Sequence, residues 1–180
     1  MRLFLSINWS RSLIIEFENL QGKLQHIGIR GHWRRGENLH LTLKFLGEIP
    51  PSQIDDISVR LEHLGKTYQA FEVDIVGFGV FPNIKSPRIL WLGVKSNTLL
   101  EVQSEIEESL HSLGISREPR EYQPHITLAS GEISGLTSDK LKIGEQISFR
   151  EFVSSICLME SSVIEGRRVY REIKKYDLRT

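Results

Sequence analysis

Two stretches of the chain share the same alternating pattern of apolar and polar residues. Residues Asn38–Gly47 read NLHLTLKFLG and residues Gln123–Ala129 read QPHITLA, so that a His-x-Thr-x pattern recurs after 85 residues. In an extended strand, residues two apart point to the same face. His40, Thr42 and Lys44 are therefore predicted on one face of the first strand, and His125 and Thr127 on one face of the second. Each strand is expected to bury an aliphatic face and to present an imidazole beside a hydroxyl.

The sequence around these strands changes between helical and strand periodicity. Helices are predicted from Ser10 or Ser12 to Leu20, over residues 54–64 with Gly65 as C-terminal cap, and over residues 96–113 with Gly114 as the stop. Strand periodicity marks residues 71–75 and 89–92, and residues 156–160 and 169–173 are typical of a hairpin that turns near Glu165 and Gly166. Hairpin-like neighbours with few long crossovers indicate an α+β fold with antiparallel sheets. No linker or low-complexity segment divides the sequence, so residues 1–180 are expected to form one domain.

Composition excludes several classes of protein. The chain has 180 residues, 39% of them hydrophobic, with 23 Lys and Arg against 23 Asp and Glu. A formal net charge of zero argues against a protein that holds long nucleic acid by neutralising phosphates alone, although it allows one RNA end in a local pocket. Cys157 is the only cysteine, which excludes an intramolecular disulfide and a cysteine zinc site. The apolar run near Met1 is too short for a membrane span, so a cytoplasmic protein without membrane contact is expected.

The repeated His-x-Thr pattern suits metal-independent phosphodiester cleavage. One imidazole can take a proton from the nucleophile while the other protonates the departing oxygen, and imidazole titrates near neutral pH. Thr42 and Thr127 could donate hydrogen bonds to the phosphate oxygens. A pair of histidines without a third ligand makes an incomplete zinc set, so no metal or other cofactor is expected. Duplication of a purely structural hairpin is the alternative explanation of the repeat.

The duplicated pattern resembles the signature of the two-histidine phosphoesterase superfamily. Its flanks resemble the LigT branch, the RNA 2′,3′-cyclic phosphodiesterases once described as 2′-5′ RNA ligases. The matching segments are residues 2–4, Trp33, residues 37–47, residues 77–83, residues 87–91 and residues 122–128.

The resemblance implies two pseudo-symmetric α+β lobes, each giving one His-x-Thr strand to a central cleft. It also implies hydrolysis of a 2′,3′-cyclic phosphate to a 2′-phosphomonoester, with possible reversible 2′-5′ ligation. His40 would then be the proton donor, His125 the proton acceptor, and Thr42 and Thr127 the phosphate ligands. An RNA terminus or a cyclic nucleotide is the implied partner, and a monomer is expected.

The chain also departs from the family pattern. Ser130 stands where many members have an arginine that helps to bind phosphate, and Gln123 replaces another common arginine. Lys44, Arg88 or another residue could supply the positive charge instead; the alternative is that activity is reduced. Tyr122 is a candidate for stacking on a base or for packing between the lobes. Asn38, Lys44, Tyr122 and Ser130 are the expected candidates for further substrate contacts.

Other assignments stay open. The basic residues between Arg167 and Arg179 could contact RNA, but the solvated face of an edge hairpin is the favoured interpretation. Trp33, Phe81 and Trp91 are assigned to the core or the rim. A phosphodiesterase for other RNA ends or 2′-5′ linkages is one alternative function, and a non-catalytic module that binds RNA ends is another.

Overall fold

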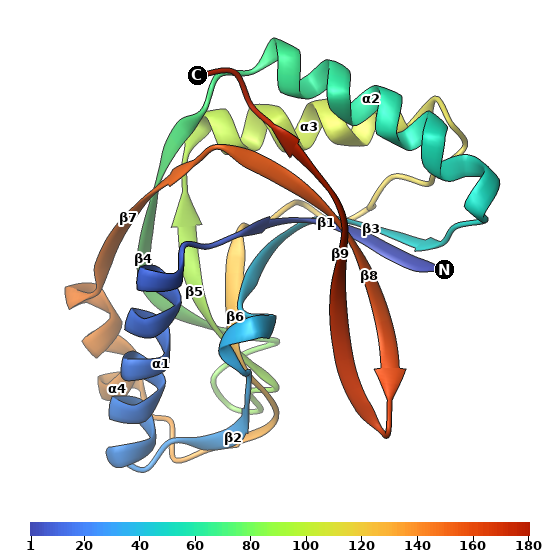
Figure 1. Ribbon diagram of the computed structural model, residues 1–180. Helices are drawn as coiled ribbons and strands as arrows, with labels where there is room; N and C mark the ends of the chain where they lie inside the picture. The colour runs from blue at the N-terminus through green and yellow to red at the C-terminus, as the bar shows by residue number, and fades with distance from the viewer.

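A computed structural model describes residues 1–180 as one antiparallel sheet with helices packed against it (Figure 1). The strands are β1 (Arg2–Asn8), β2 (Arg30–Trp33), β3 (His40–Glu48), β4 (Phe71–Phe81), β5 (Ile89–Lys95), β6 (His125–Ser134), β7 (Ser148–Val153), β8 (Ser155–Ile164) and β9 (Arg167–Asp177). The α-helices are α1 (Arg11–His26), α2 (Ile54–Thr67), α3 (Asn97–His111) and α4 (Ser138–Lys142), with short 3-10 helices at Gly36–Asn38, Pro51–Gln53 and Ile143–Gln146. The predicted α+β fold with antiparallel strands is confirmed.

The sheet has two halves that meet at the two His-x-Thr strands. Its strand order is β7-β4-β5-β6-β3-β1-β8-β9, and β2 pairs with β6 off this path. Strands β3 and β6 are joined by only one residue pair, Leu41 and Ile126. In Figure 1 the sheet bends around this junction, so that the β8–β9 hairpin stands across from β4, β5 and β6. Helices α2 and α3 lie above the bend and α1 and α4 lie at the outer side, so no α-helix covers the inner, concave face of the bend.

Both His-x-Thr strands contain a β-bulge at the same position of the pattern. On β3, Thr42 is opposite Ser6 and Lys44 is opposite Leu5, so Leu43 is the extra residue. On β6, Thr127 is opposite Trp91 and Ala129 is opposite Leu90, so Leu128 is the extra residue. A bulge shifts the alternation of side chains by one residue. The fifth residue of each pattern therefore turns to the buried face, and the sixth residue returns to the face that carries the histidine.

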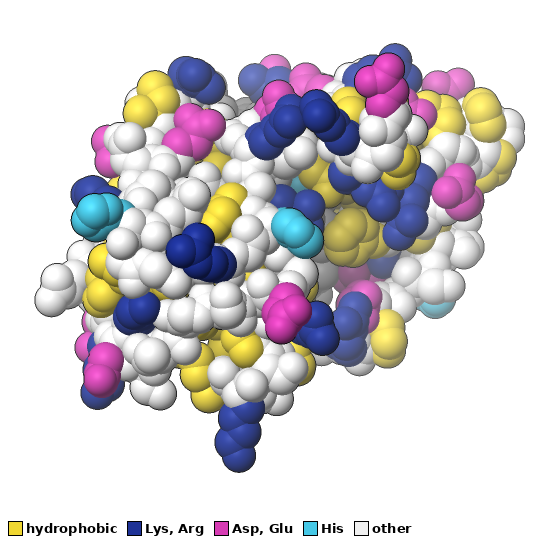
Figure 2. All heavy atoms as spheres, turned by 90° about the horizontal axis from the view of Figure 1, so that it is seen from below, with side chains coloured by type: hydrophobic (Ala, Val, Ile, Leu, Met, Phe, Trp, Pro, Cys, Tyr) yellow, Lys and Arg dark blue, Asp and Glu magenta, His cyan; other side chains and the backbone are white.

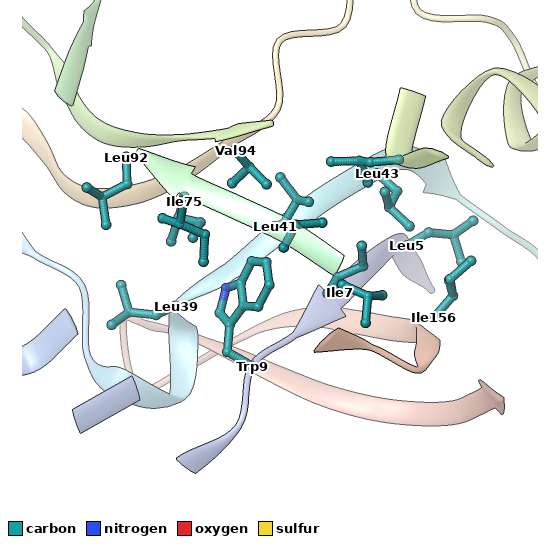
Figure 3. Close-up of a cluster of buried hydrophobic side chains, with 14 of the residues drawn as sticks. Leu5, Ile7, Trp9, Leu39, Leu41, Leu43, Ile75, Leu92, Val94 and Ile156 are labelled. Atoms are coloured by element: carbon teal, nitrogen blue, oxygen red, sulfur yellow. The ribbon is translucent and has the colours of Figure 1, made fainter. Parts of the chain in front are cut away.

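The aliphatic residues of both patterns lie in the main core. Leu41 and Leu43 of β3 meet Ile7 of β1, Val94 of β5 and Ile156 of β8 (Figure 3), and each has at most 4% of its surface exposed. Truncating such a side chain typically costs about 2–5 kcal/mol of unfolding free energy, because the lost contacts leave a cavity. The strand backbones that present the histidines are therefore held by dense packing on their opposite face.

The helix boundaries largely follow the capping signals. Ser10 caps α1 by accepting a hydrogen bond from the Leu13 amide, but α1 continues six residues beyond the predicted end at Leu20, burying Gln21 and Leu24. The prediction that Gly65 caps the second helix is wrong, since α2 continues to Thr67. Position 65 has no room for a side chain, because a β-carbon there would lie 2.5 Å from the Asp177 carbonyl oxygen. The glycine therefore allows close packing and does not serve as a helix cap.

Two further predictions agree with the structure. Gly114 follows α3 with a φ of +82°, as expected for a stop, and the C-terminal hairpin turns at Glu165 and Gly166, where both φ angles are positive. None of the helices combines the length and the apolar character needed to cross a membrane.

Candidate active site

His40 sits at the start of β3, between its motif partner Thr42 and two aromatic rings. Its Nε2 atom lies 3.2 Å from the Thr42 hydroxyl, within hydrogen-bond distance. The ring centroids of Phe4 and Tyr170 are 5.1 and 5.0 Å from that of the imidazole, with Tyr170 edge-on. These rings come from β1 and β9, so three strands of one half of the sheet position this histidine. The Phe4 ring is almost fully buried, which makes the floor beside His40 apolar.

His125 has a similar setting in the other half. Its Nδ1 atom is 2.7 Å from the backbone oxygen of Gln123, an acceptor, so Nδ1 carries the proton and Nε2 is left with its lone pair. Phe81 packs edge-on at 5.2 Å and Trp91 lies at 6.0 Å between ring centroids. Thr127 is directly opposite Trp91 in the sheet and two residues from His125. Each imidazole is therefore flanked by a threonine of its own strand and by two aromatic rings.

The two histidines lie on the concave face of the sheet. Figure 2 views the molecule from below, and it shows a hollow between the two halves with histidine, Lys or Arg, and hydrophobic side chains around it. Leu41 and Ile126 form the one ladder pair that joins β3 to β6. Because these residues lie between His and Thr in each pattern, the four polar side chains surround the junction. The structure thus brings together the two His-Thr pairs that the sequence repeat predicted.

Burial makes both imidazoles harder to protonate. Removal from water lowers the pKa of His40 from 6.5 to about 4, and the positive charges of Arg34 and His125 add to this shift. A hydrogen bond to the backbone of Asn38 partly opposes it. Burial also lowers the pKa of His125, against a smaller opposing effect of its hydrogen bond to Gln123. Both rings are therefore mainly neutral at pH 7 in the free protein, and bound anionic phosphate would favour their protonation.

The prediction that Lys44 shares the face of His40 is wrong. The bulge at Leu43 turns Lys44 to the side of Leu5, where only 4% of the residue is exposed. Its Nζ donates to Glu107 Oε2 at 2.5 Å and to the Ser116 backbone oxygen at 2.8 Å. Lys44 therefore forms a buried ion pair that joins β3 to α3, and it makes no contact with the concave face.

The other predicted contact residues have different positions. Tyr122 is half-buried and its hydroxyl donates to the Thr42 backbone oxygen at 2.9 Å, so it ties the segment before β6 to β3. Burial raises the pKa of this phenol, which keeps it a donor. Asn38 precedes β3 and its amide reaches the Arg168 backbone oxygen of the C-terminal hairpin at 3.5 Å. Ser130 follows the bulge of β6, opposite Ile89, and lies on the face of His125.

Two residues near the histidines were not singled out from the sequence. Tyr170 belongs to a hairpin that the chain places beside His40 only through long-range pairing of β8 with β1. Arg34 follows β2, a short strand without a hydrophobic run, and its charge acts on His40. The pair Arg34-Arg35 directly before the first motif is the one sequence signal that points to this cation. No group of three or more His, Cys, Asp or Glu side chains is arranged to hold a metal ion.

Known proteins resemble the chain in both sequence and fold. The profile of the family described as LigT like Phosphoesterase matches residues 10–91. The RNA 2′,3′-cyclic phosphodiesterase of Methanocaldococcus jannaschii is 31% identical over 98% of this chain and 100% of its own length. Another relative with that name, from Thermotoga maritima, is 32% identical over 83% of this chain and 79% of its own length.

Solved structures give the same architecture. TT0787 of Thermus thermophilus superposes with a TM-score of 0.85 at 24% identity, covering 99% of this chain and 98% of that one. LigT of E. coli complexed with 3′-AMP superposes with a TM-score of 0.82 at 23% identity, covering 98% and 97%. At these identities the superpositions establish the fold alone. Together with the full-length sequence match, they show that the chain belongs to the LigT-like family of RNA 2′,3′-cyclic phosphodiesterases.

Proposed function

We propose that this protein hydrolyses the 2′,3′-cyclic phosphate of an RNA end or a nucleotide to a 2′-phosphomonoester. The observation that carries the proposal is the pair of His-Thr sites on one concave face, on either side of the Leu41–Ile126 junction. The family membership of the chain supports the same reaction class. Residues 1–180 would act as one two-lobed domain and as a monomer.

In the proposed mechanism His125 is the general base. Its Nδ1 proton is held by Gln123, so the Nε2 lone pair can accept a proton from water as the water oxygen bonds to phosphorus. Its lowered pKa keeps the ring neutral at pH 7, the form that a base requires. Thr42 and Thr127 would each donate a hydrogen bond to a non-bridging phosphate oxygen. This holds the phosphorus between the two imidazoles and stabilises the charge that develops on it.

His40 is the general acid in this mechanism. It donates a proton to the 3′ oxygen as the bond from that oxygen to phosphorus breaks, which leaves the phosphate on the 2′ oxygen. With a pKa of about 4, only roughly one His40 in 10³ is protonated at pH 7 in the free protein. The negative phosphate must therefore raise this pKa on binding. This assignment of acid and base comes from the family, because the two motifs are equivalent in geometry.

Product analysis tests the proposal. Incubation with 2′,3′-cyclic AMP is expected to give 2′-AMP, and His40→Ala or His125→Ala is expected to lower kcat by about 10²–10⁴-fold, the usual contribution of general acid–base catalysis. Thermal unfolding of each variant checks that the fold is kept. Turnover close to the parent rate in either variant, or 3′-AMP as the product, would contradict the mechanism. Activity in EDTA equal to that in buffer is expected, since the protein supplies both acid and base.

The same site allows related substrates. Oligonucleotides with 2′-5′ linkages, other RNA ends and the reverse 2′-5′ ligation can be assayed beside the cyclic nucleotide, and the ratio of kcat/KM values ranks them. A module that only binds RNA ends would retain a cyclic-phosphate oligonucleotide and release no product at any pH. Two titratable imidazoles on one face argue for turnover rather than for binding alone.

A further inference from the structure

The concave face lacks a cation where the family pattern leads one to expect it. Ser130 occupies the position that returns to the histidine face after the bulge of β6. Lys44 is turned to the opposite face and is paired with Glu107. Arg88 lies on an exposed segment before β5, held by a backbone hydrogen bond to Phe81. A phosphodiester carries a full negative charge, so a site built for it gains from a positive group within contact distance.

Arg34 is a cation that the fold positions close to the second His-x-Thr strand, β6. Its backbone amide donates to the Leu128 oxygen at 2.8 Å, which sets Arg34 beside the bulge that follows Thr127. The buried Gln21 of α1 fixes both strands here, because its Nε2 donates to the backbone oxygens of Arg34 and Leu128 at 2.9 and 3.0 Å. The backbone of Arg34 is therefore held by two hydrogen bonds, one at its amide and one at its carbonyl oxygen.

The side chain of Arg34 belongs to the histidine face. Its neighbour Trp33 is opposite the fully buried Ala129 and packs against the main core. Since successive side chains of an extended segment alternate, Arg34 projects to the other face, on the side of His32 and Ser130. The charge of Arg34 acts on the His40 ring, which agrees with this direction.

The guanidinium of Arg34 has no partner in the protein. No carboxylate lies within 4.0 Å of it, although the residue is half-buried and charged. The adjacent Arg35, by contrast, is exposed and lies 3.9 Å from Glu37. A partly buried arginine without a counter-ion, whose backbone is bonded to the residue that follows Thr127, is arranged to accept an anion.

We propose that Arg34 binds a non-bridging oxygen of the substrate phosphate, in place of the arginine that the family pattern has at position 130. This inference rests on the proposed function and names a further ligand of the same site. The planar guanidinium can donate two parallel hydrogen bonds to a phosphate, which a lysine at the same place could not. The cation thus comes from the residue that follows β2, a strand that pairs with the edge of β6 opposite β5.

Four variants test the inference, with two readouts. Arg34→Ala is expected to lower kcat/KM for 2′,3′-cyclic AMP by about 10- to 100-fold, as for the loss of one charge-assisted hydrogen bond. Arg34→Lys should recover only part of this loss, because the forked geometry is missing. Arg34→Ala combined with Ser130→Arg should regain activity relative to Arg34→Ala. Arg35→Ala removes a neighbouring surface cation and should match the parent.

The second readout does not need turnover. Inorganic phosphate is titrated into each protein while the ring signals of His40 and His125 are followed by NMR. Phosphate should bind to Arg34→Ala about 10-fold or more weakly than to the parent, and Arg35→Ala should bind like the parent. In the absence of phosphate, the pKa of His40 should be higher in Arg34→Ala than in the parent, because a nearby positive charge is removed.

The outcomes separate the two proposals. If the parent hydrolyses cyclic AMP and Arg34→Ala has parent values of kcat/KM and of phosphate affinity, the inference is wrong and the proposed function stands. If the parent releases no product but binds phosphate through Arg34, the anion site stands and the proposed function is wrong. Equal losses in Arg34→Ala and Arg35→Ala, or no phosphate binding by the parent, overturn the role of Arg34.

Discussion

The lowered pKa of His40 predicts a measurable loss of stability in acid. Burial, together with the charges of Arg34 and His125, lowers the pKa of His40 from 6.5 to about 4. In the folded chain this ring stays neutral down to about pH 4, whereas in the unfolded chain it takes up a proton near its ordinary pKa. Protons therefore favour the unfolded state as the pH falls from 6.5 towards 4. The stability associated with this group is fully present above pH 6.5 and decreases below it.

The size of this effect follows from the two pKa values. Between pH 7.5 and 4.5, the free energy of unfolding loses about 2.5 kcal/mol through His40 alone, at about 1.4 kcal/mol per unit of pKa difference. His40→Gln removes the titrating group and keeps a polar side chain. Other titrating groups act on parent and variant alike, so the difference between their pH dependences isolates His40.

Urea unfolding at the two pH values measures the prediction. The parent is expected to lose about 2.5 kcal/mol more than His40→Gln between pH 7.5 and 4.5. His63→Gln, which removes an exposed histidine of α2, is the matched control and should keep the acid loss of the parent. Equal losses of stability in His40→Gln and in the parent over this range would contradict the effect assigned to the His40 ring.

Further predictions concern Lys44, Gly79 and the absence of a metal requirement. Lys44→Met leaves the half-buried Glu107 without its cationic partner, so it should lower the unfolding free energy by about 2 kcal/mol, measured in urea, with KM unchanged. Gly79→Ala would put a methyl carbon 1.9 Å from the Trp91 ring. It should cost about 2 kcal/mol of unfolding free energy and change the tryptophan fluorescence. Initial rates with cyclic AMP in EDTA should equal those in plain buffer. A raised KM in Lys44→Met, parent stability in Gly79→Ala, or loss of activity in EDTA that added metal restores would contradict these expectations.

The sequence predicts the faces of the two motif strands well up to the threonines and fails just beyond them. Period-two alternation assigns His40 and Thr42 to one face, and the structure agrees. The same alternation wrongly assigns Lys44 to this face. The bulge that turns Lys44 away depends on pairing with the neighbouring strand, so the periodicity of the sequence does not reveal it. At Leu128 the equivalent bulge carries Ser130, rather than Ala129, to the histidine face.

Arg34 and Tyr170 could not be predicted as neighbours of the site from local patterns. Arg34 follows a short strand with little hydrophobic character, and its place depends on pairing with β6 more than 90 residues later in the chain. Tyr170 reaches His40 through the order β3-β1-β8-β9, which depends on three separate strand pairings. Such contacts are decided by the packing of whole elements, so single-residue propensities carry no information about them.

The single ladder pair between the two halves also has a mechanical consequence. In a rotation about an axis, each atom moves in proportion to its distance from that axis. Leu41 and Ile126 lie next to both histidines, whereas the turn of the β8–β9 hairpin lies far from them (Figure 1). If one half of the sheet rotated against the other about this pair, the β8–β9 turn would move a long distance and the two imidazoles would move only a short distance. The hollow could thus admit ligands of different bulk while the spacing of the two imidazoles stays nearly constant.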